Sequence, residues 1–215
     1  MFSRVKQATA PVRLALGLKL FRHQRPSRRL LALLHSGWGN AGWSGDTRYL
    51  EAVWRESLHA RRILECGSGL STLILGEVAR KTGAEVYSLE HIVDWQKHVT
   101  SALTKRGLPN RVLYAPLKSY GEFDWYEVPA SLPSGFDLVI CDGPPSTTRG
   151  GRYGLLPLCK DRIERATILL DDAERSDEQQ VMDRWRSEFA VTSSVVSSPE
   201  GAFARLAIGA ATAFQ

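Results

Sequence analysis

The chain has 215 residues, of which 43% are hydrophobic and 24% charged, so it can build one globular domain with a sizeable core. Its net charge is +5, and no apolar run reaches the roughly 18 residues that cross a bilayer, which argues against a membrane-spanning segment. Its three cysteines, Cys66, Cys141 and Cys159, lack metal-ligand spacing, which favours reduced thiols in a cytoplasmic protein over a disulfide scaffold.

The first 45 residues form a basic extension that carries eight Lys and Arg and no acid, whereas the rest of the chain holds 20 basic against 23 acidic side chains. Leucine-rich stretches at 12–21 and from Pro26 onward predict two helices in it. These helices can pack over the edge of the following domain, place residues 1–35 on an anionic membrane, or act as a targeting segment. Nucleic-acid binding is disfavoured because aromatic residues are not regularly interleaved with the basic ones.

A glycine-rich segment at 37–46 joins this extension to the domain that we expect over residues 46–215. It contains two tryptophans, Trp38 and Trp43. Their rings can line an acceptor pocket, or they can anchor the extension on the core. Asp46 is placed to cap a helix over 47–59, whose apolar residues share one face.

The stretch 62–72 reads as a short apolar strand that ends in Glu65 and enters a turn, Gly67-Ser68-Gly69, before a helix begins at about residue 70. Such a turn places bare backbone and a helix N-terminus where α/β sheets bind nucleotide-like ligands. Position 72 is Thr, so the dinucleotide pattern G-x-G-x-x-G fails, and no Lys follows as a P-loop requires. An acid beside the turn disfavours phosphate and suits a ligand with ammonium and sulfonium groups.

The string Glu-Cys-Gly-Ser-Gly-Leu-Ser resembles the first motif of class I S-adenosylmethionine-dependent methyltransferases, acid-x-Gly-x-Gly. The resemblance implies that Glu65 faces the amino end of the methyl donor. It also implies that the donor lies against the turn, with contacts to Gly67, Ser68, Gly69 and Ser71.

A second strand, 85–89, ends in Glu90, which lies 21 positions after Gly69. An acid at that distance can accept hydrogen bonds from ribose hydroxyls, as the resemblance also implies, or it can cap the next helix, 92–105. His91 follows Glu90 and is a candidate for a further contact to the methyl donor or for an alternative catalytic base. A third strand, 111–115, precedes Leu117, where the family borders the adenine ring.

A fourth strand, 136–141, is a nearly continuous apolar run that stops at Asp142-Gly143-Pro144-Pro145. In the family the residue at this place faces the transferred methyl group. Asp142 is therefore a candidate contact to the methyl donor and a candidate catalytic base. The branches that methylate amino groups often carry Asn-Pro-Pro-Tyr or Asp-Pro-Pro-Tyr here. The inserted glycine argues against adenine or glutamine N-methylation.

A fifth strand, 166–170, ends in Asp171-Asp172, and neighbouring strand ends lie about 5 Å apart. Asp142, Asp171 and Asp172 can therefore meet and bind Mg²⁺ or another divalent cation, or the last two can cap the helix near 176. Their spacing resembles the metal site of catechol-type O-methyltransferases. Two departures are Asp172, where that family has Asn, and Pro145, where it has a lysine.

Asp142-Gly143-Pro144, Gly151-Arg152 and a strand ending in Asp-Asp-x-x-Arg together resemble sugar-directed O-methyltransferases of the glucuronoxylan type. This resemblance implies a hydroxyl or carboxyl acceptor with anionic neighbours. The loop 146–153 can cover such an acceptor and hold an anion between two arginines. The candidate substrate contacts are Trp43, Arg149, Arg152 and Tyr153.

The chain ends in a helix, 177–189, and two strands, 190–197 and 202–208, that predict an antiparallel hairpin. The expected fold is therefore α/β, a doubly wound Rossmann-like seven-stranded sheet in the family order 3-2-1-4-5-7-6 behind a helical extension. We expect an enzyme that O-methylates a small hydroxyl-bearing acceptor such as a sugar or phenol, and a homodimer is compatible with it. The alternatives are a non-catalytic cofactor-binding module and an NAD-dependent oxidoreductase.

Overall fold

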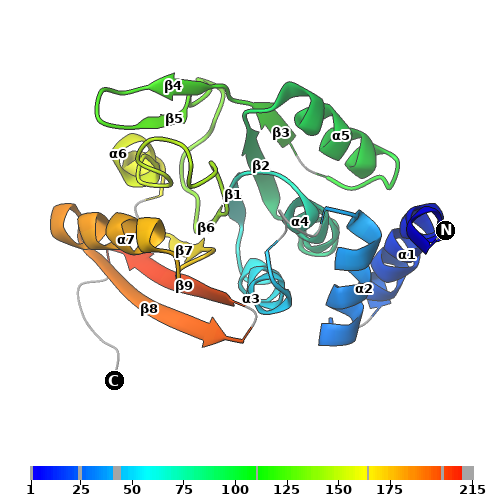
Figure 1. Cartoon of the computed structure of the whole chain (residues 1–215). Coiled ribbons are helices and arrows are strands. Elements are labelled where there is room, and N and C mark those ends of the chain that lie inside the picture. The colour runs from blue at the N-terminus through cyan, green and yellow to red at the C-terminus, as the bar shows by residue number, and fades with distance from the viewer. Residues whose placement is uncertain are drawn as a thin grey trace.

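A seven-stranded sheet forms the centre of the computed structural model, which describes residues 2–23, 26–40, 45–109, 111–163, 165–199 and 201–209 (Figure 1). The strands follow the order β3-β2-β1-β6-β7-β9-β8, and only the pairs that involve β9 are antiparallel. This confirms the predicted fold, with β6 to β9 as the fourth to seventh strands. The bounds are β1 (Arg62–Cys66), β2 (Glu85–Glu90), β3 (Arg111–Tyr114), β6 (Leu138–Cys141), β7 (Thr167–Leu170), β8 (Val191–Ser198) and β9 (Gly201–Ile208).

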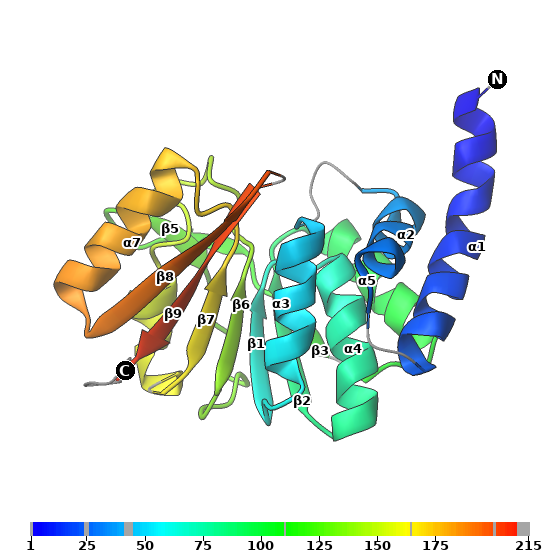
Figure 2. The same cartoon turned by 90° about the horizontal axis from the view of Figure 1, so that it is seen from below.

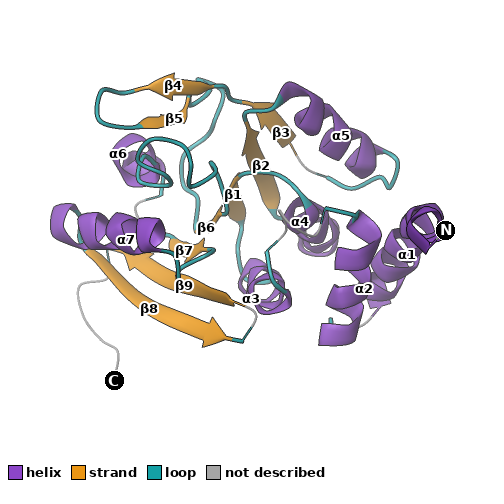
Figure 3. Cartoon of the chain, viewed as in Figure 1, coloured by secondary structure: helices purple, strands orange, loops and turns teal. Residues whose placement is uncertain are grey.

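Helices cover both faces of the sheet, so its central strands are apolar on both sides (Figure 3). In β6, Leu138 and Ile140 pack with α3 and α4, whereas Val139 and Cys141 face the core formed with α6 and α7. This alternation explains why the sequence shows a continuous apolar run there. The helix bounds are α3 (Thr47–Ser57), α4 (Leu70–Thr82), α5 (Val93–Thr104), α6 (Leu155–Cys159) and α7 (Ser176–Glu188), with a 3₁₀ turn, η2 (Lys160–Arg162).

A small antiparallel hairpin that the sequence did not predict follows β3. Its strands are β4 (Leu117–Ser119) and β5 (Asp124–Tyr126). Trp125 is fully buried beneath it, and a Cβ on Gly154 would lie only 2.6 Å from its ring. The hairpin therefore closes one side of the core and carries Tyr126 to the carboxyl edge of the sheet.

The basic extension folds into two helices, α1 (Phe2–His23) and α2 (Arg28–Trp38), and α1 is longer than predicted because it continues through Pro11. Buried leucines of both helices join the hydrophobic cluster of α4 and α5. A Cβ on Gly37 would lie 2.5 Å from the Leu14 nitrogen, so glycine lets the two helices approach closely. Arg22 also pairs with the buried Glu77 of α4 at 3.1 Å. None of the described helices is both long and apolar enough to cross a bilayer.

Candidate functional site

A cleft of about 1200 Å³ opens at the carboxyl ends of the parallel strands. Figure 2 shows this edge with α2 beside it, and α2 contributes Ala32, His35 and Ser36 to the wall. The turns after β1, β2, β6 and β7 form the floor. The extension is therefore part of the cleft, as one of the alternatives in the sequence suggests.

The glycine turn after β1 touches the turn after β6. Gly67 has a φ of +87°, in the left-handed region that favours glycine, and its Cβ would lie 3.1 Å from the Gly143 nitrogen. The Gly69 N–H donates to Thr72 Oγ1 at 2.8 Å. Thr72, the residue that breaks the dinucleotide pattern, therefore fixes the turn by capping the first turn of α4.

Glu65 is enclosed beneath this turn. Its Oε2 accepts hydrogen bonds from Thr72 Oγ1 at 2.7 Å and Ser88 Oγ at 2.5 Å. Burial raises the pKa of Glu65 to about 7, against the opposing effect of hydrogen bonds from Ser88, Ser71 and Thr72. The side chain has no exposed surface, so it does not offer the direct ligand contact that the motif predicts. Ser71, also a predicted donor contact, is likewise buried beside Glu65.

Glu90 lines the cleft at the end of β2 and holds two turns together. Its Oε2 accepts from the Ser68 N–H at 3.1 Å and the Ser68 hydroxyl at 2.7 Å, and its Oε1 accepts from the Ile92 N–H at 2.9 Å. Burial raises the pKa of Glu90, but hydrogen bonds from His91, Ile92 and Ser68 outweigh it, so the pKa lies below its ordinary value. Glu90 thus links the glycine turn to Ile92, the residue that precedes α5, and its contact with a ribose stays a prediction.

Aromatic side chains that the sequence reasoning missed complete this half of the cleft. Trp95 Nε1 donates to the Ser68 carbonyl at 2.7 Å, and its ring stacks on His98 with centroids 5.0 Å apart. The buried hydroxyl of Tyr126 has no hydrogen-bond partner in the described part of the chain, and its ring lies 6.0 Å from that of His91. The sequence does offer a signal for Trp95, because this residue lies in the first turn of the helix predicted after Glu90.

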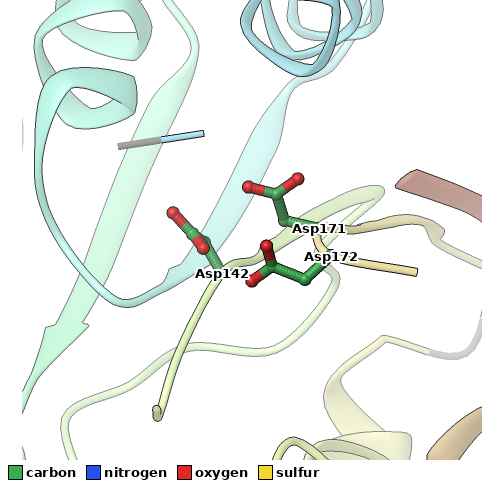
Figure 4. A group of neighbouring side chains, drawn as sticks. All are labelled: Asp142, Asp171 and Asp172. Atoms are coloured by element: carbon green, nitrogen blue, oxygen red, sulfur yellow. The ribbon is translucent and has the colours of Figure 1, made fainter. Parts of the chain in front are cut away.

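Three carboxylates meet at the ends of β6 and β7 (Figure 4). Asp142, Asp171 and Asp172 each offer an oxygen, and these oxygens lie within 4.8 Å of one another. Burial, opposed by Arg152 and reinforced by Asp172, raises the pKa of Asp142 to about 7. Burial and the charges of Asp142 and Asp172 also raise the pKa of Asp171 well above its ordinary value. The sequence correctly placed these acids at one edge of the sheet.

The side chain of Arg152, which is 2% exposed, lies among these acids. Its guanidinium donates to Asp172 Oδ2 at 2.8 Å and lies 3.3 Å from Asp142 Oδ1. Asp172 also pairs with Arg175 at 2.8 Å, and no side chain caps the start of α7, so the predicted capping role of the acids is not seen. Arg152 is therefore already engaged by protein carboxylates, which differs from its predicted role as an anion-holding residue.

The other predicted substrate contacts lie elsewhere. Arg149 pairs with Asp124 and donates to Ser119 at 2.7 Å, on the β4–β5 hairpin outside the cleft. Tyr153 is buried and its hydroxyl donates to Glu188. Leu117 belongs to β4 and is not among the residues that line the cleft, whereas His91 is. Trp43 falls outside the described residues.

The sheet is parallel except for β9, a glycine turn follows β1, and acids lie at the end of β2 and directly after β6. This arrangement defines the class I methyltransferase architecture. A family model described as methyltransferase domain matches residues 64–173, from β1 to the acidic edge of β7. This match covers just over half of the chain, so the chain belongs to the methyltransferase domain family.

Solved structures with the same fold are distant in sequence. The S-adenosylhomocysteine-bound methyltransferase PaMTH1 of Podospora anserina is 15% identical, with 94% of this chain and 93% of that chain covered and a TM-score of 0.60. An O-methyltransferase of Bacillus cereus in complex with the same compound is 16% identical, with 90% and 97% covered and a TM-score of 0.59. A methyltransferase of Pyrococcus furiosus is 16% identical, with 75% and 80% covered and a TM-score of 0.52. No curated protein matches the chain in sequence.

Proposed function

We propose that this methyltransferase transfers the methyl group of S-adenosylmethionine to a hydroxyl oxygen of a small, neutral acceptor such as a sugar or a phenol. The observation that carries the proposal is the position of Asp142. Asp142 directly follows β6, and its partly exposed carboxylate lines the same cleft as the glycine turn. A base and a nucleoside-binding turn therefore share one cleft.

The donor half of the cleft has groups that fit a sulfonium nucleoside. Gly67 and Ser68 of the glycine turn line the cleft, and a Cβ on the adjacent Gly69 would meet nothing within 4 Å. Glu90 lines the same half of the cleft, which supports its proposed contact with the ribose hydroxyls. Distant structures of the same fold were solved with S-adenosylhomocysteine, which supports this choice of donor over a nicotinamide cofactor.

The acceptor half of the cleft is acidic, which argues against the acceptor with anionic neighbours that the sequence suggested. Asp46, Asp171, Asp172 and Glu174 line it together with Asp142. Because Arg152 is engaged by these acids, a carboxylate or phosphate on the acceptor would face net negative charge. We therefore favour an uncharged acceptor whose hydroxyl groups donate to the carboxylates.

Asp142 would act as the general base. S-adenosylmethionine supplies a methyl group already activated on sulfur. Asp142 would accept the proton of the acceptor hydroxyl as the oxygen bonds to the methyl carbon in line with the breaking carbon–sulfur bond, whose electron pair stays on sulfur. The products are the methyl ether, S-adenosylhomocysteine and the protonated carboxyl.

The test combines calorimetry with a screen of sugars and phenols. We expect S-adenosylhomocysteine to bind and NAD⁺ not to bind. Asp142→Asn should retain donor affinity and lose at least about 100-fold in turnover. Asp124→Asn, which removes an acid paired with Arg149 outside the cleft, is the matched control and should retain turnover. Donor binding without turnover on any acceptor would instead favour a non-catalytic module.

A further inference from the structure

A buried guanidinium occupies the centre of the acid cluster. The guanidinium of Arg152 contacts the carboxylates of Asp142 and Asp172 at the ends of β6 and β7, and it also reaches Glu178 of α7 at 3.5 Å. Its other contacts are to main-chain oxygens, at 2.6 Å from Asp171 and 2.9 Å from Asp142. Arg152 therefore bridges both strand ends and the helix that covers them.

Three of the six carboxylate oxygens in the cluster already face a guanidinium group. Asp172 accepts from Arg152 through Oδ2 and from Arg175 through Oδ1, both at 2.8 Å. One oxygen of Asp142 lies 3.3 Å from Arg152. Mg²⁺ requires near-octahedral oxygen ligands at about 2.1 Å, and here it would also lie close to the positive charge of a buried guanidinium. The residues present do not fit a divalent cation beside Arg152.

We propose that Arg152 takes the place of the divalent cation that catechol-type O-methyltransferases hold at this edge, so that this protein binds no metal there. The guanidinium stays charged at any physiological pH and is fixed by its burial. It thereby orients the Asp142 carboxylate toward the cleft and compensates its charge. Arg152 is a positioning residue, and its role in turnover rests on the proposed function.

Metal binding provides a test that needs no acceptor. We expect titration of the full chain with Mn²⁺, followed by electron paramagnetic resonance, to show no stoichiometric site. Arg152→Met keeps the apolar stem and removes the charge, so it should create a Mn²⁺ site at least about 10-fold tighter than any in the wild type. Arg149→Met removes a guanidinium of the same loop that pairs outside the cleft, and it should leave Mn²⁺ binding unchanged.

Activity provides the second readout. Exhaustive chelation should leave wild-type turnover unchanged, and Arg152→Met should lower it by at least about 100-fold without changing S-adenosylhomocysteine affinity. A wild-type protein that binds one Mn²⁺ and loses turnover on chelation would overturn the proposal, even if Arg152→Met fails to fold. An inactive wild type that binds no Mn²⁺ would contradict the proposed function and leave the cation replacement supported.

A second inference concerns α1, which has an apolar stripe on its outer face. Val12, Leu16 and Leu20 are 68%, 50% and 39% exposed and recur every four residues, so they lie on one side of the helix. Leu14 and Leu18 are buried on the opposite side. Since α1 is apolar on both sides, its outer stripe can bury its side chains only against a binding partner, because the rest of the described chain does not cover it.

The charge of the basic extension indicates which kind of partner binds the outer stripe of α1. The first 45 residues carry eight basic side chains and no acid. A second copy of α1 would bring like charges together, whereas anionic lipid headgroups would pair with exposed bases of α1 such as Lys19 while the stripe enters the interface. Figure 2 shows that α1 extends beyond the other helices at its N-terminal end. We infer that the outer face of α1 docks this protein on an anionic membrane surface.

Vesicle sedimentation tests this docking independently of methyl transfer. The full chain should bind phosphatidylglycerol-containing vesicles and not pure phosphatidylcholine. Val12→Gln/Leu16→Gln/Leu20→Gln should lower binding by at least about 10-fold, and the single charge reversal Lys19→Glu should weaken it without disturbing the core. Val195→Gln/Val196→Gln alters exposed valines of β8 and should have no effect. Equal binding by all variants, or a dimer that only the stripe variant dissociates, would overturn the inference.

Discussion

The Ser88 hydroxyl donates to Oε2 of Glu65 over 2.5 Å, and neither side chain is exposed to solvent. The two residues are direct partners in the parallel pairing of β1 and β2. Thr72 of α4 donates to the same oxygen at 2.7 Å. The acid of the glycine motif therefore connects two strands to the helix that begins at the turn. In this arrangement the carboxyl group is buried away from water.

This burial predicts that Glu65 makes stability depend on pH. Its pKa is about 7 in the folded protein against 4.5 for the unperturbed group, so the folded state binds the proton more tightly. The stabilisation that the proton provides is complete below pH 4.5 and is lost as the pH rises through 7. By linkage this amounts to about 3 kcal/mol. Glu65→Gln should therefore be more stable than the wild type at pH 8, by about 1–3 kcal/mol, and this difference in the free energy of unfolding should be smaller at pH 5.

Urea unfolding of both proteins from pH 5 to 8 measures this difference and cancels the titration of other acids. Glu85→Gln, on β2 and partly exposed beside Arg62, is the matched control and should follow the wild type. If the difference between Glu65→Gln and the wild type stays constant across this range, Glu65 does not titrate as its burial requires.

The sequence predicted the sheet well because its buried strands are apolar runs that stop at an acid or a glycine. Glu90 and Asp142 were found in this way, since the end of a parallel strand fixes where the next residue lies. The β4–β5 hairpin was missed because Lys118 and Asp124 interrupt any apolar alternation. The role of Arg152 could not be predicted, because the sequence around a loop arginine does not reveal whether its side chain is solvated or buried among carboxylates.

Trp95 is predicted to shape the donor half through one hydrogen bond. Trp95→Phe leaves the Ser68 carbonyl without the indole donor, so the turn should loosen and S-adenosylhomocysteine affinity should fall about 3- to 10-fold. Calorimetry measures this change. Trp185→Phe is the control, because the Trp185 indole also donates to a carbonyl, that of Tyr153, at 2.9 Å away from the cleft. It should lower stability and leave affinity unchanged, whereas equal losses of affinity would refute a local role for Trp95.

Gly143 is predicted to be required for contact between the turns after β1 and β6. A Cβ there would lie 2.5 Å from the Tyr126 hydroxyl and 3.0 Å from the Gly67 Cα, and the second contact is to backbone that cannot move aside. Gly143→Ala should therefore lower the free energy of unfolding by about 1–3 kcal/mol. Gly69→Ala places its Cβ in open space and should leave stability nearly unchanged. Adding Tyr126→Phe to Gly143→Ala should recover only part of the loss, because the Gly67 contact remains.

The last prediction concerns how firmly the basic extension is attached. Leu34 of α2 is fully buried in the cluster shared with α4 and α5, and it lies so close to α1 that a Cβ on Gly17 would be 2.7 Å from its side chain. Leu34→Ala should therefore lower the free energy of unfolding of the whole chain by about 2–5 kcal/mol while unfolding remains a single transition. Leu20→Ala, on the exposed face of α1, should change it by less than about 0.5 kcal/mol. An early separate transition in Leu34→Ala would instead show that the extension folds on its own and that the wall of the cleft formed by α2 can detach.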